Sequence, residues 1–491
     1  MKKFFILFAT ICCWHITNAD ACTSLLAGRG ATTDGSTFIT YAADSHTLYG
    51  SLVYIPATHY PENTMLEVKE WDTGKPLGHI PQVESTYAVM GNMNEYQLSI
   101  TESTWGGRPE LVDTTGIIDY GSLMFITLQR AKTAREAIKV MTDLVKKHGY
   151  YSSGESFSIA DPNEVWIMEM IGKGVHNKGA VWVAVRIPDD CISAHANQAR
   201  IHTFPLDDKD NCVYSPDVIS FAREKGYFDG LNKDFSFANA YAPADFGALR
   251  GCEARVWSFF RKFNNTMDDY LSYINGESKT PIPLYVKPNR KLSAQDMKDA
   301  MRDHFENTPF DMTQDVGAGP FKVPYRFRPM TFTVDSVEYT QERAIATQQT
   351  GFTLVAQMRN WLPDAVGGVL WFGVDDTNTC VYIPIYCSAT EVPECFNPKN
   401  GSLYKLSWTS AFWIHNWVAN MAYARYNYMI KDIRPVQQQL ENEFNTWQPS
   451  IEKAAIDLYK NDKDAAIRFL TAYSVAQAQR STARWKELGE Y

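Results

Sequence analysis

Cys22 has the most distinctive chemical setting in this chain, because it directly follows a predicted leader peptide. Cleavage after Ala21 would create a first residue that carries both a thiol and a free α-amine. An α-amine has an ordinary pKa of about 7.7–8.0, and a cysteine thiol has one of about 8.5. The amine is therefore a base suited to neutral pH, one residue away from a nucleophile. This pairing predicts acyl transfer through a thioester, without a histidine partner.

The first 21 residues have the three parts of a secretory signal peptide. Two lysines precede an apolar run over residues 4–14, and Ala19 and Ala21 place small residues at positions −3 and −1 of the cleavage site. The apolar run is shorter than the roughly 20 residues that span a bilayer. We therefore expect export to the periplasm or the cell exterior. Whether signal peptidase or self-processing exposes Cys22 stays open.

Two other roles for Cys22 stay open at this stage. A lipid anchor could be attached to a cysteine after a leader, although Asp20 departs from the small residue that such sites carry. Cys22 could also pair with another cysteine. Cleavage leaves an odd number of cysteines, namely Cys22, Cys191, Cys212, Cys252, Cys380, Cys387 and Cys395. At least one is then unpaired, and the other six can form up to three disulfides.

The spacing of the last three cysteines favours one local disulfide, with buried free thiols as the alternative. Their connectivity cannot be read from the sequence, because six cysteines allow 15 pairings.

Composition limits the function classes. The 491 residues are 45% hydrophobic and 21% charged, as in globular proteins, and the net charge is −9. This charge provides no general attraction to nucleic acid or to an anionic membrane. After the leader, no apolar stretch is long enough to span a bilayer. No metal motif such as H-E-x-x-H occurs, so we expect neither a metal nor another cofactor.

Strands and helices are both predicted along the chain. A turn over residues 31–36 makes the second strand run back along the first, so that Asp44 lies near the start of the first strand. Residues 92–96 are a second hairpin candidate. Apolar residues at helical spacing predict helices over 121–148 and 437–486. The composition of residues 205–330 predicts loops with short helices. The expected strands are 23–27, 37–41, 87–91, 97–101, 156–160, 165–169, 180–186, 191–194, 353–357, 368–372 and 380–384. The pattern predicts a single α+β domain over 22–491.

Several blocks, taken in order, resemble the bacterial dipeptidase A type cysteine peptidases. They are residues 22–37, 91–95, 101–104, 193–201, 253–257, 315–320, 348–352 and 367–375. This family is similar to the choloylglycine hydrolases and penicillin V acylases, which are N-terminal-nucleophile hydrolases. The resemblance implies a four-layer αββα sandwich with the nucleophile at the start of an inner strand.

The resemblance also implies roles for individual residues. Cys22 matches the nucleophile, and Asp44 matches the acid that holds the α-amine. Arg255 matches a buried arginine whose charge favours a thiolate. Asn197 matches the amide that donates to the oxyanion.

The sequence departs from this family at one position of the site. Relatives often carry an arginine three residues before the acid, whereas Tyr41 stands there in this chain. A second active-site cation is therefore missing or comes from elsewhere. A second oxyanion donor also stays undecided between Asn94 and Thr104.

The resemblance implies hydrolysis of dipeptides or short peptides by an exported enzyme. An amidase for other N-acyl compounds, such as bile-acid conjugates or penicillins, is the alternative within the same chemistry. A lipid-anchored binding protein without catalysis is the alternative outside it. Whether the chain forms a homo-oligomer is left open.

Overall fold

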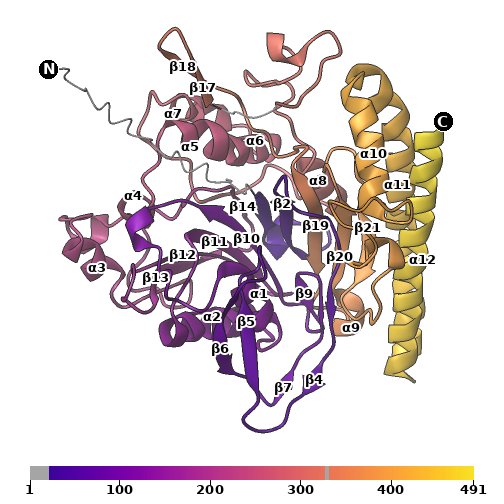
Figure 1. The fold of residues 1–491 in the computed structure, drawn as a ribbon, viewed down its shortest axis with the longest axis horizontal. Coiled ribbons are helices and arrows are strands. Elements are labelled where there is room, and N and C mark those ends of the chain that lie inside the picture. Colours follow the sequence, from indigo (N-terminus) through magenta and orange to yellow (C-terminus); the bar gives the residue numbers. More distant parts are fainter. Residues whose placement is uncertain (1–21, 327–330) are drawn as a thin grey trace, which may run out of the picture.

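Two large antiparallel sheets form the body of the protein (Figure 1). The computed structural model describes residues 22–326 and 331–491, so the predicted leader lies outside the described residues. Within these residues, the seven-stranded sheet has the order β16 (Tyr285–Val286), β14 (Ile192–His195), β1 (Ser24–Ala27), β2 (Thr37–Asp44), β19 (Thr350–Met358), β20 (Val369–Val374), β21 (Ile383–Tyr386).

The second sheet of the described chain has eight strands. Its order is β15 (Cys212–Tyr214), β13 (Ala180–Ile187), β12 (Val165–Gly172), β11 (Gly154–Ala160), β10 (Ser99–Trp105), β9 (Met93–Asn94), β8 (Val89–Met90), β3 (Tyr54–Ile55). Three small hairpin-like pairs join β4 (Thr58–His59) to β7 (Ser85–Thr86), β5 (Met65–Lys69) to β6 (Pro76–Pro81), and β17 (Thr331–Val334) to β18 (Val337–Thr340).

The two large sheets contact each other through their central strands. Every residue of β2 is buried, because its two faces are both covered. Side-chain hydroxyls cross between the sheets: Ser24 donates to the carbonyl of Glu102 over 3.3 Å, and Thr101 donates to the carbonyl of Thr40 over 3.1 Å. These bonds satisfy polar groups that would otherwise be buried without partners.

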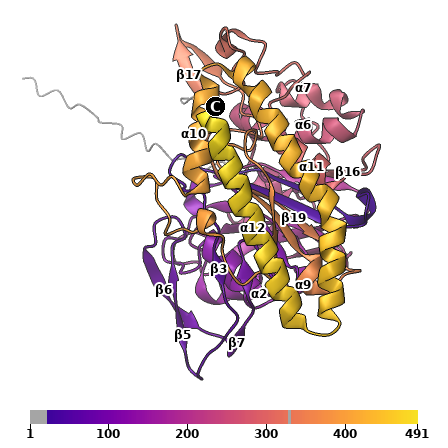
Figure 2. The same cartoon turned by 90° about the vertical axis from the view of Figure 1, so that its right-hand side faces the viewer.

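Helices pack on both sheets (Figures 1 and 2). α1 (Tyr120–Leu128) contacts β10, and α2 (Ala134–His148) contacts β11, β12 and β13. On the other sheet, α6 (Ala254–Phe263) contacts β14 and α8 (Ala294–Ala300) contacts β19. The long C-terminal helices α10 (Ala411–Tyr423), α11 (Tyr426–Tyr459) and α12 (Lys463–Glu490) pack against one another and against β20 and β21. The short helices are α3 (Val218–Glu224), α4 (Phe237–Tyr241), α5 (Phe246–Ala248), α7 (Leu271–Ile274) and α9 (Asp364–Gly367).

The predicted mixture of antiparallel strands and helices is confirmed, with differences at some boundaries. The helix expected over 121–148 is two helices, because the Thr133 side chain accepts from the Glu136 amide and starts α2 anew. The last strand begins three residues later than expected, since a turn at Asp376 occupies that stretch. The hairpin expected around residues 92–96 is partly wrong, because Met93–Asn94 form β9, which pairs with both β8 and β10. C-terminal helices begin at Ala411, earlier than expected.

The predicted local disulfide is wrong. All seven cysteines of the described residues are free thiols. Cys380 packs beside Gly373 at one end of β20, whereas Cys387 packs beside Gly368 at the other end. A strand rises about 3.3 Å per residue, so the two thiols lie too far apart for a disulfide. The extended β21 separates them.

A search of the described helices finds none with both the length and the apolar character that a bilayer crossing requires.

A buried ion pair connects the C-terminal helices to the sheet. Arg302 contacts the carboxylate of Glu441 over 2.5 Å, and the same carboxylate accepts from the amide of Tyr382 over 2.9 Å. Both side chains are less than 10% exposed. If one of the two side chains were replaced by a neutral one, the other would remain as a buried charge without a counter-ion.

We expect Glu441→Gln to lower the free energy of unfolding by about 3 kcal/mol, the lower end of the cost of breaking a buried ion pair. The cost is at the lower end because Arg302 keeps its contact with Asp299. The shift of the urea unfolding midpoint measures this effect. Asp457→Asn is the matched control, since it removes an exposed acid of the same helix and should leave the midpoint unchanged. Equal midpoints for wild type and Glu441→Gln would contradict the role of the pair.

Candidate active site

Sheet topology brings the predicted site residues to one edge of the seven-stranded sheet. β1 is antiparallel to both of its neighbours, so its start lies beside the ends of β2 and β14. Cys22 comes just before β1, Asp44 ends β2, and Asn197 follows β14. Thr350, at the start of β19, lies in register with Asp44. The strand order therefore gathers residues that are far apart in the sequence.

Arg255 joins the start of β1 to the loop after β14. One guanidinium nitrogen donates to the carbonyl of Cys22 and to the hydroxyl of Thr23, both over 2.8 Å. The other donates to the carbonyl of Ala196 over 3.1 Å and to Oδ1 of Asn197 over 2.9 Å. Burial lowers the pKa of Arg255 to about 10, so the side chain remains cationic at neutral pH.

The contact with Arg255 determines how the amide of Asn197 is oriented. Its oxygen accepts from Arg255, and its nitrogen donates to the carbonyl of Thr104 over 2.6 Å. The backbone of Asn197 is in the left-handed region, with φ of 57°. Asparagine tolerates this conformation better than most residues. These two bonds therefore fix the orientation of the amide, and Arg255 links it to the carbonyl of Cys22.

Arg343 supplies the second cation that the sequence left unassigned. It approaches Oδ2 of Asp44 to 2.7 Å, and Thr350 donates to Oδ1 of the same carboxylate over 2.7 Å. Burial raises the pKa of Asp44 to about 6, although Arg343 and Thr350 act in the opposite direction. Arg343 comes from the segment after β18, so the second cation is supplied from a part of the chain far from Tyr41 in sequence.

The thiol of Cys22 lies among acidic groups. It is 5% exposed, and its sulfur is 3.4 Å from Oε1 of Glu102 and 3.7 Å from the hydroxyl of Tyr41. Burial raises the pKa of this thiol well above its usual value, and the negative charges of Glu102 and Asp44 raise it further. A thiolate here consequently requires an additional positive charge or a base.

Glu102 belongs to a buried pair of carboxyl groups. Tyr41 donates a hydrogen bond to Oε1 of Glu102, and the hydroxyl of Thr104 lies between Glu102 and Glu155, 2.7 Å from Glu155. Burial raises the pKa of both acids, and the charge of Glu102 raises that of Glu155 further. The protonated form of both carboxyl groups is therefore favoured, and the effect is stronger on Glu155.

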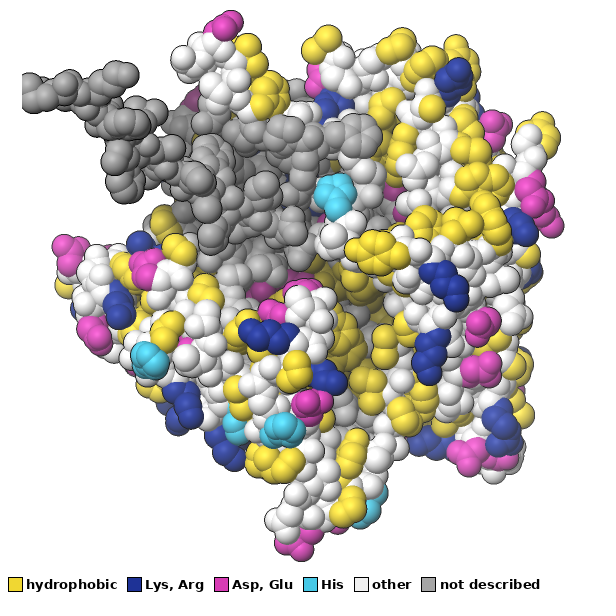
Figure 3. Space-filling view, viewed as in Figure 1, with side chains coloured by type: hydrophobic (Ala, Val, Ile, Leu, Met, Phe, Trp, Pro, Cys, Tyr) yellow, Lys and Arg dark blue, Asp and Glu magenta, His cyan; other side chains and the backbone are white. Residues whose placement is uncertain are grey.

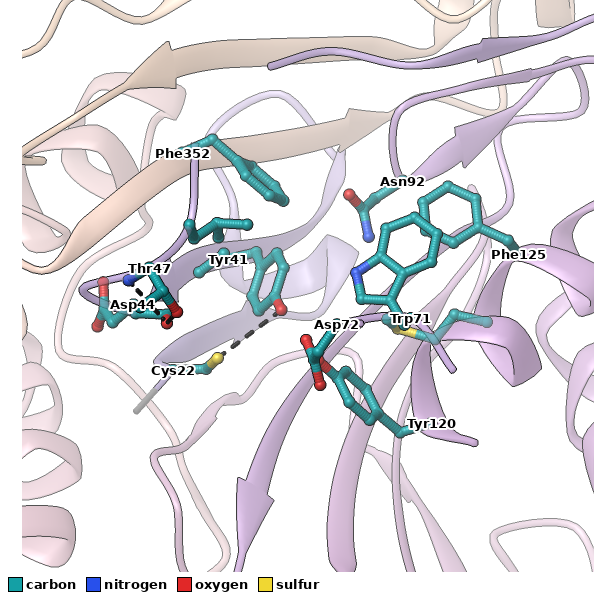
Figure 4. Close-up of a pocket in the computed structure, with 14 residues that line it drawn as sticks. Cys22, Tyr41, Asp44, Thr47, Trp71, Asp72, Asn92, Tyr120, Phe125 and Phe352 are labelled. Atoms are coloured by element: carbon teal, nitrogen blue, oxygen red, sulfur yellow. Dashed lines mark hydrogen bonds between the residues drawn. The ribbon is translucent and has the colours of Figure 1, made fainter. Parts of the chain in front are cut away.

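Cys22 opens onto a pocket of about 130 Å³ (Figure 4). One water needs only about 10–15 Å³, so a ligand of several atoms fits. In Figure 3, hydrophobic side chains gather in a hollow near the middle of the face, with acidic side chains on its rim. The lining residues of the pocket are Cys22, Tyr41, Ala43, Asp44, Ser45, Thr47, Leu48, Trp71, Asp72, Asn92, Tyr120, Met124, Phe125 and Phe352.

The predicted residues divide into lining and supporting positions. Cys22 and Asp44 line the pocket, whereas Arg255 and Asn197 lie beside it in contact with each other. Neither candidate for the second oxyanion donor lines it. Asn94 donates to the carbonyls of Leu128 and Ala131 near the end of α1, so its amide has a structural role.

His195 is unsuited to act as a base. Its two ring nitrogens each lie 2.7 Å from a hydroxyl, one from Ser103 and the other from Ser158. Burial lowers its pKa to about 3. The imidazole therefore bridges the two sheets as a neutral group.

Sequence reasoning missed Arg343, Glu102, Glu155, Tyr120 and Asp72 as parts of the site. Glu102 lay within a block that carried the family resemblance, and this was its only signal in the sequence. Arg343 was signalled indirectly, by the missing cation at Tyr41. Asp72 and Tyr120 come from a hairpin turn and a helix start, and nothing in their local sequence points to the pocket.

Within residues 22–326 and 331–491, no group of three or more His, Cys, Asp or Glu side chains is arranged to hold a metal ion.

Comparisons with known proteins identify the family of the chain. A model described as peptidase family C69 matches residues 21–439. A "Probable dipeptidase" of Latilactobacillus sakei is 27% identical over 478 residues, which covers 92% of this chain and 90% of that protein. A "Probable dipeptidase" of Salmonella dublin is 27% identical, with coverage of 79% and 85%. "Dipeptidase A" of Lactobacillus helveticus is 24% identical, with coverage of 90% and 88%.

We expect Glu102→Gln to lower the pKa of the Cys22 thiol, because it removes the nearest negative charge. The pH dependence of iodoacetamide labelling of Cys22 should move to lower pH. Glu155→Gln is the matched control, since Glu155 is not among the acids whose charge raises the pKa of the thiol, and it should leave the profile nearly unchanged. An unchanged profile in Glu102→Gln, or equal shifts in both variants, would contradict this charge assignment.

Proposed function

The chain belongs to peptidase family C69, and on this premise we propose that it is an exported dipeptidase whose nucleophile is the thiol of Cys22 at the mature N-terminus. The observation that carries the proposal is the position of Cys22. Its thiol opens onto the pocket that Asp44 also lines, just before a central strand, and lies 3.4 Å from Glu102, while its carbonyl accepts from Arg255. The names of the similar proteins support a dipeptide as the substrate.

Removal of residues 1–21 is part of the proposal. The match to the family begins at residue 21, one position before Cys22. Cleavage there would expose an α-amine beside Asp44, whose carboxylate would hold it. The protonated amine would also supply the positive charge that the thiol lacks in its acidic surroundings. Both effects favour proton transfer from sulfur to nitrogen.

The reaction then proceeds as an acyl transfer. The Cys22 sulfur attacks the peptide carbonyl carbon, and the amide of Asn197 donates to the oxyanion. The C–N bond breaks as the leaving amine takes the proton that the α-amine received. Water then attacks the thioester, which releases the first amino acid and restores the thiol. Arg255 acts as a positioning residue, since it holds both the Cys22 carbonyl and the Asn197 amide.

Glu102 is a second candidate for the base. Its carboxylate is 3.4 Å from the Cys22 sulfur and accepts from the thiol, whereas both nitrogens of His195 are occupied by serine hydroxyls. In this second form of the proposal, the thiol proton passes to Glu102 and the α-amine is dispensable.

The proposal includes assignment of the fold to the αββα sandwich of N-terminal-nucleophile hydrolases. It is supported by two antiparallel sheets that contact each other through β2, with α1 and α2 on one and α10–α12 on the other. It is also supported by a candidate nucleophile at the start of β1.

The alternatives differ in what they require of Cys22 and the pocket. A lipid-anchored binding protein would carry a diacylglyceryl group on Cys22, and the intact mass of the mature N-terminus reveals it. An amidase for other N-acyl compounds would use the same thiol on a different acyl group. Hydrolysis of dipeptides compared with bile-acid conjugates and penicillins distinguishes these two enzymes.

Blocking the α-amine tests which group is the base. A chain with an uncleaved residue before Cys22 keeps the thiol but turns the amine into an amide. We expect dipeptide hydrolysis to fall by about 10²–10⁴-fold, the usual contribution of general acid–base catalysis. Both preparations need N-termini verified by mass, because self-processing would restore Cys22. Cys22→Ala should be inactive in either form.

Equal rates from the blocked and free forms would reject the amine as base and favour Glu102. Activity in Cys22→Ala would reject the nucleophile itself.

Asn197→Gly tests the oxyanion donor. Glycine adopts the left-handed backbone of position 197 without strain, so this change removes the amide and its bonds to Arg255 and Thr104 without distorting the loop. We expect kcat to fall by about 10²–10³-fold, with little change in KM, as for the loss of one oxyanion donor. An unchanged kcat would contradict the assignment, and a rise confined to KM would indicate ground-state binding instead.

A further inference from the structure

The pocket beside Cys22 presents acidic groups to a ligand. Among its lining residues in the described chain, Asp44 and Asp72 are the charged ones. Asp44 is buried and contacts Arg343, so its charge is largely balanced within the protein. Asp72 is exposed, and Figure 4 shows it with Tyr120 on the side of Cys22 opposite Asp44. A cationic group of a ligand would therefore meet the carboxylate of Asp72.

The turn that carries Asp72 is anchored to the start of α1. Tyr120 donates its hydroxyl hydrogen to Oδ1 of Asp72 over 2.8 Å. The amide of Trp71 donates to Asp119 over 2.6 Å, and the Trp71 ring stacks on Phe125 with centroids 4.3 Å apart. Gly121 makes this contact feasible, since a Cβ there would lie 2.3 Å from the Trp71 ring. These contacts hold the carboxylate in place before a substrate binds, which reduces the entropic cost of binding.

Dipeptide stereochemistry brings the substrate's ammonium group into the same pocket. The ammonium nitrogen and the scissile carbonyl carbon are bonded to one α-carbon, so they lie only about 2.5 Å apart. When the carbonyl reaches the Cys22 sulfur, the ammonium group must lie in the space next to it. Phenol oxygens of Tyr41 and Tyr120 line that space, and they can accept its hydrogen bonds.

We infer that Asp72 binds the free α-ammonium group of the dipeptide and thereby selects substrates with an unblocked N-terminus. The inference rests on the proposed function, because it takes Cys22 as the nucleophile. It also separates the dipeptidase from an amidase for bile-acid conjugates or penicillins, whose acyl groups carry no ammonium at this position. The contact with Asp72 selects the residue on the N-terminal side of the scissile bond, so the N-terminus of the substrate must lie within this pocket.

Two acyl compounds isolate the ammonium group. Alanyl-alanine and N-propionyl-alanine differ only in that the second has a hydrogen in place of the ammonium. With Cys22 verified by mass as the first residue, we expect the wild-type protein to prefer alanyl-alanine strongly. Asp72→Asn should raise KM for alanyl-alanine by about 10- to 100-fold, the effect of losing one hydrogen bond between charged groups. Its kcat/KM for N-propionyl-alanine should not change, so the preference collapses.

Two further variants complete the test. Asp72→Glu keeps the charge and should recover part of the preference. Glu67→Gln is the matched control, since it removes an exposed acid from the adjoining strand β5, where Glu67 pairs with Lys69 outside the pocket. It should leave both substrates unaffected.

The possible failures are distinguishable. If the wild-type protein hydrolyses neither compound nor any other dipeptide, the proposed function fails and the ammonium site fails with it. If alanyl-alanine is hydrolysed and Asp72→Asn keeps the wild-type preference, only the ammonium site is overturned. Equal losses on both compounds would also overturn it, since they indicate a general role in shaping the pocket.

Discussion

The hydrogen bonds of the Arg255 guanidinium are the interaction on which the site depends. A single planar group bonds the carbonyl of Cys22, the hydroxyl of Thr23 and the side chain of Asn197. It therefore fixes the start of β1 relative to the loop after β14, and with it the candidate nucleophile relative to the candidate oxyanion donor. Arginine suits this position because its five donors keep a rigid geometry. Because the guanidinium is buried, loss of one acceptor would leave a costly unsatisfied donor.

Charge balance around Cys22 is the second constraint. Asp44, Glu102 and Glu155 bring carboxyl groups into the buried region next to the thiol, and Arg255 and Arg343 bring two cations. Arg343 pairs with Asp44, and burial together with the charge of Glu102 raises the pKa of Glu155, which favours its protonated form. Tyr41 donates to Glu102. The buried carboxyl groups beside the thiol are thus held by a phenol, a hydroxyl and two cations.

The two sheets contribute different parts of the pocket. The seven-stranded sheet supplies Cys22 and Asp44, the eight-stranded sheet supplies Glu102 beneath the thiol, and the turn docked on α1 supplies Asp72. The candidate nucleophile therefore lies at the start of a central strand, whereas the group that we assign to substrate selection lies on a connecting turn. Folds commonly separate the two in this way, since loops vary without disturbing the core.

The sequence by itself determined the candidate nucleophile, the central strands, the helical regions around α1, α2, α12 and the second half of α11, and the family, because these follow from local patterns and ordered motifs. Cys22 is marked by the predicted leader before it, and β1 and β2 by the Asp34-Gly35 turn between them. The other contacts of the site join residues that are far apart in the sequence, so only the tertiary structure determines them. Arg343 and Asp44 are 299 positions apart in sequence, and Glu102 and Cys22 are 80 apart. No local propensity encodes such pairings, and the sheet order and the packing of one sheet on the other create them. For the same reason, the tertiary structure alone kept the cysteines apart along β20 and brought Asp72 to the pocket.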